Sequence, residues 1–167
     1  MHRGPLVRVV VDTYRLPDGS TVGRDLVLHP SAAAIVPILP DGRVLLVSQF
    51  RHAVGKSLWE IPAGKLERDE LALECARREL REETGHDALV WEELCSFYTS
   101  PGFTDERMTL FLADEAFPVS DVMDDEIASC QAFCPGDVHR LLTEGEIEDA
   151  KTILGLSVLR LRTCGRP

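Results

Sequence analysis

The chain has 167 residues, of which 44% are hydrophobic and 28% charged, and its formal net charge at pH 7 is -10. This composition indicates one folded domain with its own core. So acidic a chain is a poor general binder of nucleic acid, because phosphate contacts need Lys and Arg, although metal ions could still join it to a polyanion. No apolar stretch approaches the roughly 20 residues that span a bilayer, and Met1–Pro5 lacks the apolar core of a signal peptide, so we also expect no membrane partner.

The N-terminal region predicts a β-hairpin. Residues 6–14 and 21–29 are rich in β-branched side chains, and Pro17-Asp18-Gly19 separates them. We therefore divide the chain into a hairpin region, residues 1–30, and a main domain, residues 31–167.

The hairpin carries much apolar surface for an element that is only marginally stable alone. Apolar side chains recur on both strands: Val7, Val9, Val11, Val22, Leu26 and Leu28. We expect this surface to be buried in a homodimer, since one patch then serves both copies. The alternative is a hairpin that folds back on its own domain.

The main domain alternates predicted strands with three predicted helices. Strands are expected at residues 31–38, 43–50, 57–61, about 89–98, 107–114 and 127–133. Helices are expected at about 70–84, where Leu73, Ala76 and Leu80 recur at helical spacing and Gly85 terminates, at 138–143, and at about 149–162 with Asp149 as N-cap. The predicted fold is an α/β sandwich with a mixed central sheet and an N-terminal antiparallel hairpin region.

Three carboxylates share one face of the first predicted helix. Glu79, Glu82 and Glu83 are spaced by three and four residues and border the apolar stripe. Such a cluster repels itself unless a cation neutralises it, and oxygen ligands at this density suit Mg²⁺ or Mn²⁺. The plainer alternative is a solvated acidic face that is paired with Arg77, Arg78 and Arg81.

The spacing of the flanking residues resembles the signature of the Nudix family, G-x5-E-x7-R-E-U-x-E-E-x-G-U, in which U is a bulky aliphatic residue. The chain fills it with Gly64, Glu70, Arg78, Glu79, Leu80, Glu82, Glu83 and Gly85. Only the last position departs, because His86 stands where an aliphatic side chain usually packs under the loop. That departure concerns stability more than chemistry.

The resemblance implies a Nudix-type α/β/α sandwich and a loop–helix–loop that binds divalent metal, Mg²⁺ or Mn²⁺. It implies that Glu79 and Glu83 are the main ligands, that Glu82 helps through metal or water, and that Glu82 and Glu83 belong to the catalytic set. Gly64, Glu70, Arg78 and Gly85 would hold the motif together. The implied reaction is hydrolysis of a diphosphate linkage, with metal ions screening the phosphate charge.

Segments outside the motif resemble the ADP-ribose pyrophosphatase branch of the family. These segments are Gln49-Phe50-Arg51, Leu58–Gly64 and Ser100–Glu106. The branch implies hydrolysis of ADP-ribose to AMP and ribose 5-phosphate, and a metal contact from the carbonyl of Ala63. It also implies a homodimer that builds part of the nucleoside pocket from both chains. Rival substrates are other nucleoside-diphosphate sugars and oxidised nucleoside diphosphates.

Four residues are candidates for substrate contacts: Arg51, Glu60, Phe103 and Glu106. Arg51 is interpreted as a phosphate contact, the alternative being a strand-end charge paired with Glu60. Phe103 belongs either to the core or to the wall of the nucleoside pocket. Trp59 is interpreted as a core residue.

The general base is expected on the acidic loop at residues 121–127. Glu126 is our choice and Asp124 the second, the alternative being a merely solvated loop. A non-catalytic ADP-ribose sensor is disfavoured, because nothing after residue 135 has the length or basic charge of a DNA-binding unit.

The cysteine pattern indicates reduced thiols. The five cysteines are an odd number without paired spacing, and Cys130 and Cys134 have only His139 nearby, too little for a zinc site. We expect five reduced thiols and a cytoplasmic protein.

Overall fold

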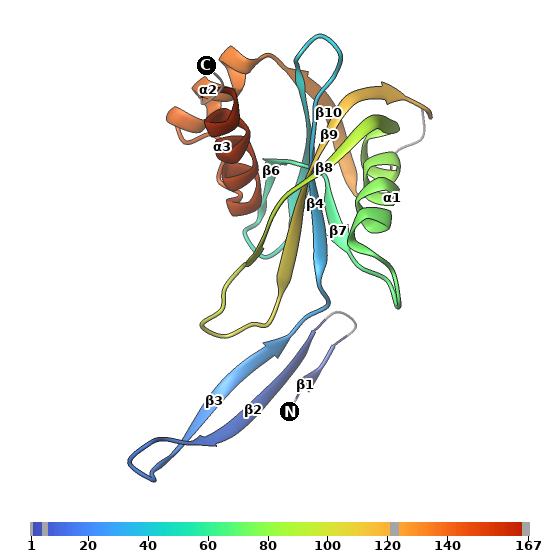
Figure 1. The fold of residues 1–167 in the computed structure, drawn as a ribbon. Coiled ribbons are helices and arrows are strands. Elements are labelled where there is room, and N and C mark those ends of the chain that lie inside the picture. Colours follow the sequence, from blue (N-terminus) through green and yellow to red (C-terminus); the bar gives the residue numbers. More distant parts are fainter. Residues whose placement is uncertain (1, 5–6, 121–123, 165–167) are drawn as a thin grey trace.

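The computed structural model describes residues 2–4, 7–120 and 124–164. Figure 1 shows a main body of sheets and helices from which a hairpin extends. The described strands are β1 (His2–Arg3), β2 (Arg8–Arg15), β3 (Thr21–Leu28), β4 (Ala32–Pro37), β5 (Val44–Arg51), β6 (Lys56–Glu60), β7 (Ala63–Lys65), β8 (His86–Tyr98), β9 (Arg107–Pro118) and β10 (Ile127–Phe133). The described helices are α1 (Ala72–Thr84), α2 (Pro135–Thr143) and α3 (Ala150–Cys164). No described helix combines the length and apolar character needed to cross a bilayer.

The predicted N-terminal hairpin is confirmed. β2 and β3 pair along their whole length, from Arg8 opposite Leu28 to Arg15 opposite Thr21. A short strand that the sequence did not predict, β1, adds to the edge of β2. The first residue of the predicted strand, Leu6, lies outside the described residues.

The strand register puts the hairpin's apolar side chains on both of its faces. Val9 stands opposite Val27 and Val10 opposite Leu26, and neighbouring residues of a strand point to opposite faces. Val11 therefore lies on the face opposite to Leu26, and it is 67% exposed. A single chain thus leaves apolar surface in contact with water on this extension.

The base of the hairpin is fastened to the loop between β8 and β9. The Val27 amide donates to the carbonyl of Phe103 at 2.7 Å, and the Asp105 amide donates to the carbonyl of Val27 at 3.4 Å. The His29 amide donates to the Asp105 carboxylate at 2.9 Å. The hairpin and this loop therefore hold each other in place.

The main body contains a mixed sheet, as predicted, and a second sheet beside it. The mixed sheet has the order β7-β4-β9-β8, in which β4 and β9 run parallel and the other neighbours antiparallel. The second sheet, β10-β5-β6, is antiparallel. Figure 1 shows α1 on one side of this body and α2 and α3 on the other, which confirms the predicted sandwich.

Strand β4 joins two hydrophobic clusters. All six of its residues are buried, as its continuous apolar run leads one to expect for a central strand. Ala33 and Ile35 pack in a cluster with Leu80 of α1. Ala34 and Val36 pack in the other cluster, which includes Leu156 of α3. Since β4 also pairs with β7, the strand that leads into α1, the core fixes the start of the carboxylate helix.

The helix ends follow their capping residues. Gly85 ends α1 in the left-handed conformation with φ 68°, and the Asp149 carboxylate accepts from the Thr152 amide at 2.9 Å at the start of α3. Both were predicted. Helix α2 begins at Pro135, three residues before its predicted start, because the Cys134 sulfur accepts from the Asp137 amide and caps an earlier turn.

The structure also tests the predictions for Trp59 and for the cysteines. Trp59 packs edge-to-face against Phe133, with ring centroids 5.0 Å apart, and is a core residue as expected. The four cysteines whose side chains are described are free thiols: Cys75, Cys95, Cys130 and Cys134.

Candidate active site

A cavity of about 840 Å³ lies where the two sheets, α1 and the start of α3 meet, a size that suits a small-molecule ligand. It brings together side chains from parts of the chain that are far apart in sequence. The polar residues that line it are His29, Gln49, Arg51, Lys65, Arg78, Glu79, Glu82, Glu83, Thr99, Ser100, Glu106, Asp124, Glu126, Asp149 and Lys151.

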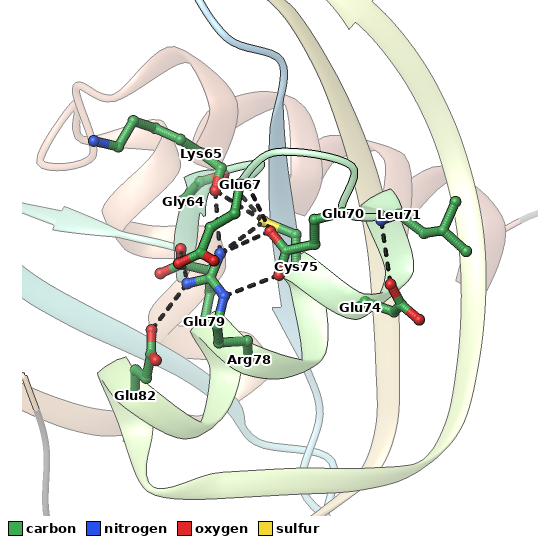
Figure 2. Close-up of polar contacts among 10 residues, drawn as sticks. All are labelled: Gly64, Lys65, Glu67, Glu70, Leu71, Glu74, Cys75, Arg78, Glu79 and Glu82. Carbon is green, nitrogen blue, oxygen red and sulfur yellow. Dashed lines mark hydrogen bonds and ion pairs between the residues drawn. The ribbon is translucent and has the colours of Figure 1, made fainter. Parts of the chain in front are cut away.

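Arg78 organises the loop–helix unit on one wall of the cavity (Figure 2). Its guanidinium makes a bidentate contact with Glu70, Nε to Oε1 at 2.9 Å and Nη2 to Oε2 at 3.0 Å, and Nη2 also donates to the carbonyl of Lys65. Glu70 in turn accepts from the amide of Glu67. The hydrogen bond from Arg78 holds the pKa of Glu70 below its ordinary value. Both residues fasten the loop to the helix, which is the role that the resemblance to the family motif implies.

The same guanidinium neutralises the carboxylate face of α1. Its Nη1 lies 2.6 Å from Glu79 Oε1 and 3.0 Å from Glu82 Oε2. Arg77 and Arg81 do not share this task, because Arg77 lies over the ring of Trp91 and Arg81 pairs with Asp87. Two of the three carboxylates on this face, those of Glu79 and Glu82, are therefore paired through one arginine, and both residues line the cavity.

Gly64 leaves room for the carboxylate of Glu79. A Cβ atom added at Gly64 would lie 1.8 Å from Glu79 Oε1, far inside any contact distance. The glycine of the motif is therefore required by close approach rather than by a turn conformation. Burial raises the pKa of Glu79, although the hydrogen bond from Arg78 opposes this shift.

Glu83 is a buried carboxylate without a cationic hydrogen-bond partner among the described residues. It accepts from the amide of Ala63 at 3.1 Å, which brings β7 against the last turn of α1. Burial raises the pKa of Glu83 to about 8, opposed by that hydrogen bond and increased by the negative charge of Glu79. A buried carboxylate in this state would gain from a cation.

The carboxylate wall fits a divalent metal by its donor chemistry. Glu79 and Glu83 supply hard oxygen atoms at a partly buried position, and the space over Gly64 is filled by one of them. No three His, Cys, Asp or Glu side chains of the described residues already converge as a ligand set. Arg78 draws Glu79 and Glu82 toward itself, so a metal would compete with its guanidinium for them.

The facing wall carries a second cluster of charges, centred on Glu60. Arg51 Nε donates to Glu60 Oε1 at 2.7 Å and Nη2 to Oε2 at 2.6 Å, and Lys151 also binds Oε2. Burial would raise the pKa of Glu60, but the hydrogen bond from Arg51 and the charge of Lys151 hold it below its ordinary value. Arg51 lines the cavity and is paired with Glu60, the contact that the alternative interpretation named, whereas Glu60 lies behind that wall with its side chain 2% exposed.

The acidic loop before β10 brings both candidate bases to the cavity. Asp124 Oδ1 accepts from the Glu126 amide, and the Asp124 amide donates to the carbonyl of Glu82. The Glu126 carboxylate accepts from the side-chain amide of Gln49 at 3.2 Å. Residues 121–123, the first part of the predicted loop, lie outside the described residues.

The loop between β8 and β9 contributes Glu106 but not Phe103 to the described cavity. Glu106 accepts from the Thr99 hydroxyl at 2.6 Å and lies 3.3 Å from His29 Nδ1. Phe103 is 54% exposed and is not among the lining residues, so it belongs to neither the core nor the cavity wall of a single chain.

Sequence reasoning gave no site role to Gln49, Lys151 or His29. Gln49 stands two residues before Arg51 on β5, and this alternation puts both side chains on one face of the strand. Lys151 follows Asp149 at the start of α3. The Gln-x-Arg spacing could have indicated a site role for Gln49, whereas the positions of Lys151 and His29 at the cavity depend on packing between distant segments.

Comparison with known proteins assigns the chain a family and relatives. Residues 28–156 match the NUDIX domain. The chain is 36% identical to an ADP-ribose pyrophosphatase of Bacillus subtilis over 95% of this chain and 88% of the relative. It is equally similar, over the same shares, to a methanol dehydrogenase activator of Bacillus methanolicus. An ADP-ribose pyrophosphatase of Mycobacterium tuberculosis is 34% identical over 99% of this chain and 82% of the relative.

A solved structure shares the fold. The crystal structure of an ADP compounds hydrolase superposes with a TM-score of 0.86, covering 100% of this chain and 92% of that chain. Its sequence identity is 22%, so this likeness concerns the architecture alone. The hairpin region and the sandwich are both part of the shared fold.

A Gly64→Ala variant should bind Mn²⁺ at least about tenfold more weakly while it remains folded, because the new methyl group displaces the Glu79 carboxylate. Electron paramagnetic resonance of free Mn²⁺ measures this loss. Gly102→Ala is the matched control, since a Cβ atom there meets no atom within 4 Å. Equal Mn²⁺ affinity in the two variants would contradict the assignment of Glu79 as a ligand.

Glu83→Gln should stabilise the metal-free protein at pH 8 but not at pH 4. The pKa of Glu83 is about 8 in the folded protein, above the ordinary value of 4.5. At pH values between these two, the Glu83 carboxyl group keeps its proton in the folded chain but loses it in the unfolded chain. Rising pH therefore favours unfolding until pH 8, and Gln removes that penalty. Thermal denaturation in excess chelator at pH 4, 6 and 8 measures it, with the exposed Glu93→Gln as control. A difference in Tm that does not change with pH would refute the argument.

Proposed function

Because the chain belongs to the NUDIX domain family, we propose that it is a hydrolase that splits ADP-ribose into AMP and ribose 5-phosphate with Mg²⁺ or Mn²⁺. The observation that carries this proposal is the cavity whose one wall is the carboxylate helix and whose other wall presents Arg51. Near end-to-end similarity to two ADP-ribose pyrophosphatases supports the substrate. Enzymes of this family generally need a divalent metal.

The metal would be held by Glu79 and Glu83, with Glu82 and the carbonyl of Ala63 as further oxygen donors. When bound, such an ion screens the charge of the diphosphate and lowers the pKa of a coordinated water. The chain's own contribution is positional. Arg78 holds the loop that carries Gly64 against the helix, and the Gly64 space keeps the Glu79 carboxylate close to the backbone of β7.

Arg51 is the residue that we expect to bind a phosphate of the substrate. Two of its nitrogen atoms are fixed on Glu60, and none of the described residues accepts from the third, Nη1. Its side chain is 40% exposed at the cavity wall. A guanidinium fixed in this way offers a preorganised donor to an anion.

Glu126 is the residue that we expect to accept the proton of the attacking water. Its carboxylate faces the cavity and meets Gln49, whereas Asp124 uses a carboxylate oxygen to fix the local turn. The Gln49 side-chain amide donates a hydrogen bond to the Glu126 carboxylate and so orients it. This difference in partners supports Glu126 over Asp124 as the general base.

We further propose that two copies assemble through the hairpin region, residues 1–30. The apolar side chains on both of its faces, and the exposed ring of Phe103 beside its base, support this proposal. A two-fold contact would cover the extension and bring a partner's hairpin toward the loop at residues 99–106.

The four free thiols suit the reducing cytoplasm that we propose as the compartment.

The substrate proposal predicts that ADP-ribose is hydrolysed with a higher kcat/KM than GDP-mannose, diadenosine polyphosphates or dNTPs in the presence of Mg²⁺ or Mn²⁺. Chromatography of the products should give AMP and ribose 5-phosphate. The Glu83→Gln variant should lose activity by about two orders of magnitude or more, since it removes a ligand charge. A higher kcat/KM for another substrate would contradict ADP-ribose as the substrate but would not affect the family assignment.

The base proposal predicts that Glu126→Gln lowers kcat by about 100-fold or more with little change in KM. Asp124→Asn should change kcat by less than about fivefold, because the Asn oxygen can still accept from the Glu126 amide. Steady-state kinetics on ADP-ribose measures both. A larger loss of kcat in Asp124→Asn than in Glu126→Gln would assign the proton transfer to Asp124.

The dimer proposal predicts a mass of twice 18.5 kDa in light scattering coupled to size exclusion. Val11→Asp, which puts a charge on the exposed apolar face, should shift the protein to monomer at micromolar concentration. Ser57→Asp, which introduces the same charge at an exposed position of β6, should leave the mass unchanged. A wild-type protein that elutes as a monomer would refute the dimer.

A further inference from the structure

The carboxylate of Glu60 is fully occupied by two cations. Arg51 binds both of its oxygen atoms, and Lys151 binds Oε2 as well. The side chain is 2% exposed, so substrate does not reach it. Glu60 therefore connects Lys151, on the third helix, with Arg51, on the cavity wall.

Lys151 is held at this place by its neighbours in the chain. Asp149 accepts from the Thr152 amide and hydroxyl and from Lys151 Nζ at 3.0 Å, which fixes the first turn of α3. The Ile61 amide donates to the Thr152 hydroxyl at 2.9 Å. Glu60–Lys151 and Ile61–Thr152 are thus two consecutive contacts between the end of β6, with the residue that follows it, and the first turn of α3, and they set the lysine ammonium directly on Glu60.

A buried lysine needs a reason, because desolvation of an ammonium group is costly and few lysines are buried unless they are paired. The Lys151 side chain is 9% exposed although the residue lines the cavity. Without its charge, Glu60 and Asp149 would be two buried or half-buried carboxylates with Arg51 as their shared cation. The Arg51 guanidinium would then be drawn toward both and away from one fixed orientation.

We propose that Lys151 is a positioning residue that fixes Arg51 through Glu60, and thereby sets the affinity for the substrate phosphate. This inference rests on the proposed function, in which Arg51 binds the diphosphate. Lys151 itself does not touch the substrate, since both acidic neighbours hold its ammonium group.

The kinetic test compares Lys151→Met with Lys151→Arg and Lys56→Met. Lys151→Met should raise the KM for ADP-ribose about tenfold and change kcat by less than about threefold, and Lys151→Arg should restore most of the affinity. Lys56→Met is the matched control, because Lys56 also joins β6 to the segment before α3, through Glu148, but on the surface. It should leave both constants unchanged. If Lys151→Met does not fold, Lys151→Gln, which keeps an N–H donor without the charge, replaces it.

A double-mutant cycle separates positioning from direct contact. If Lys151 acts through Arg51, Lys151→Met should weaken binding by less than about twofold further in an Arg51→Met background. Additive losses would overturn the proposal and make Lys151 a substrate contact. An unchanged KM in Lys151→Met would also overturn it.

A measurement without substrate or metal keeps this inference separate from the proposed function. The Nε–H resonance of Arg51, identified by its loss in Arg51→Lys, should exchange with water about tenfold faster in Lys151→Met than in the wild type or in Lys56→Met. Equal exchange rates would refute the positioning role. Absence of ADP-ribose hydrolysis by the wild type would instead reject the substrate, while the exchange rates still decide whether Lys151 fixes Arg51.

Discussion

The site depends on one arginine that holds mutually repelling carboxylates together. Arg78 binds Glu70, Glu79 and Glu82 and the carbonyl of Lys65 with a single guanidinium. Its fixed fork of donors suits this, because Nε and Nη2 bind the Glu70 carboxylate together while Nη1 binds Glu79 and Glu82. A lysine would offer a point charge without the fork, and neither neighbouring arginine faces these groups. The loop, the helix and the cavity wall are therefore stabilised by the same residue.

The pKa values of the two buried glutamates, Glu60 and Glu83, are shifted in opposite directions because their neighbours differ. Glu60 meets Arg51 and Lys151, so its pKa lies below the ordinary value despite burial. Glu83 meets a backbone amide and the negative Glu79, so burial raises its pKa to about 8. The first carboxylate is satisfied within the protein and serves to orient cations. The second is destabilised in the absence of a cation, and this difference supports the proposal that Glu83 is a metal ligand whereas Glu60 is structural.

The features that sequence could predict are those that short-range spacing determines. The shared face of Glu79 and Glu83 and the Gly85 helix end lie within one helix, so helical periodicity and capping rules predict them. The contact between Glu70 and Arg78 was expected only from the resemblance to the family motif. The final motif position, His86, also has a local explanation: its ring nitrogen lies 2.6 Å from the carbonyl of Thr84.

The features that sequence could not predict depend on packing between distant segments. Lys151 and Glu60 are 91 residues apart, and Gln49 and Glu126 are 77 apart. Their contacts follow only from how α3 lies against β6 and how β10 pairs with β5. The hairpin is a similar case, because alternating valines indicate a strand but not the register that puts Val11 and Leu26 on opposite faces.

The charge of the cavity explains why the site needs a cation from outside the chain. Of the described residues that line it, seven are carboxylates and four are Lys or Arg. Three of these four cations, Arg51, Arg78 and Lys151, already bind carboxylates. A free diphosphate would therefore meet a wall whose positive charge is largely neutralised, in a chain with a net charge of -10. Affinity for such an anion cannot come from a general basic surface. We therefore propose that it comes from a few oriented donors such as Arg51 together with bound metal, so that recognition depends on the arrangement of these groups rather than on net attraction.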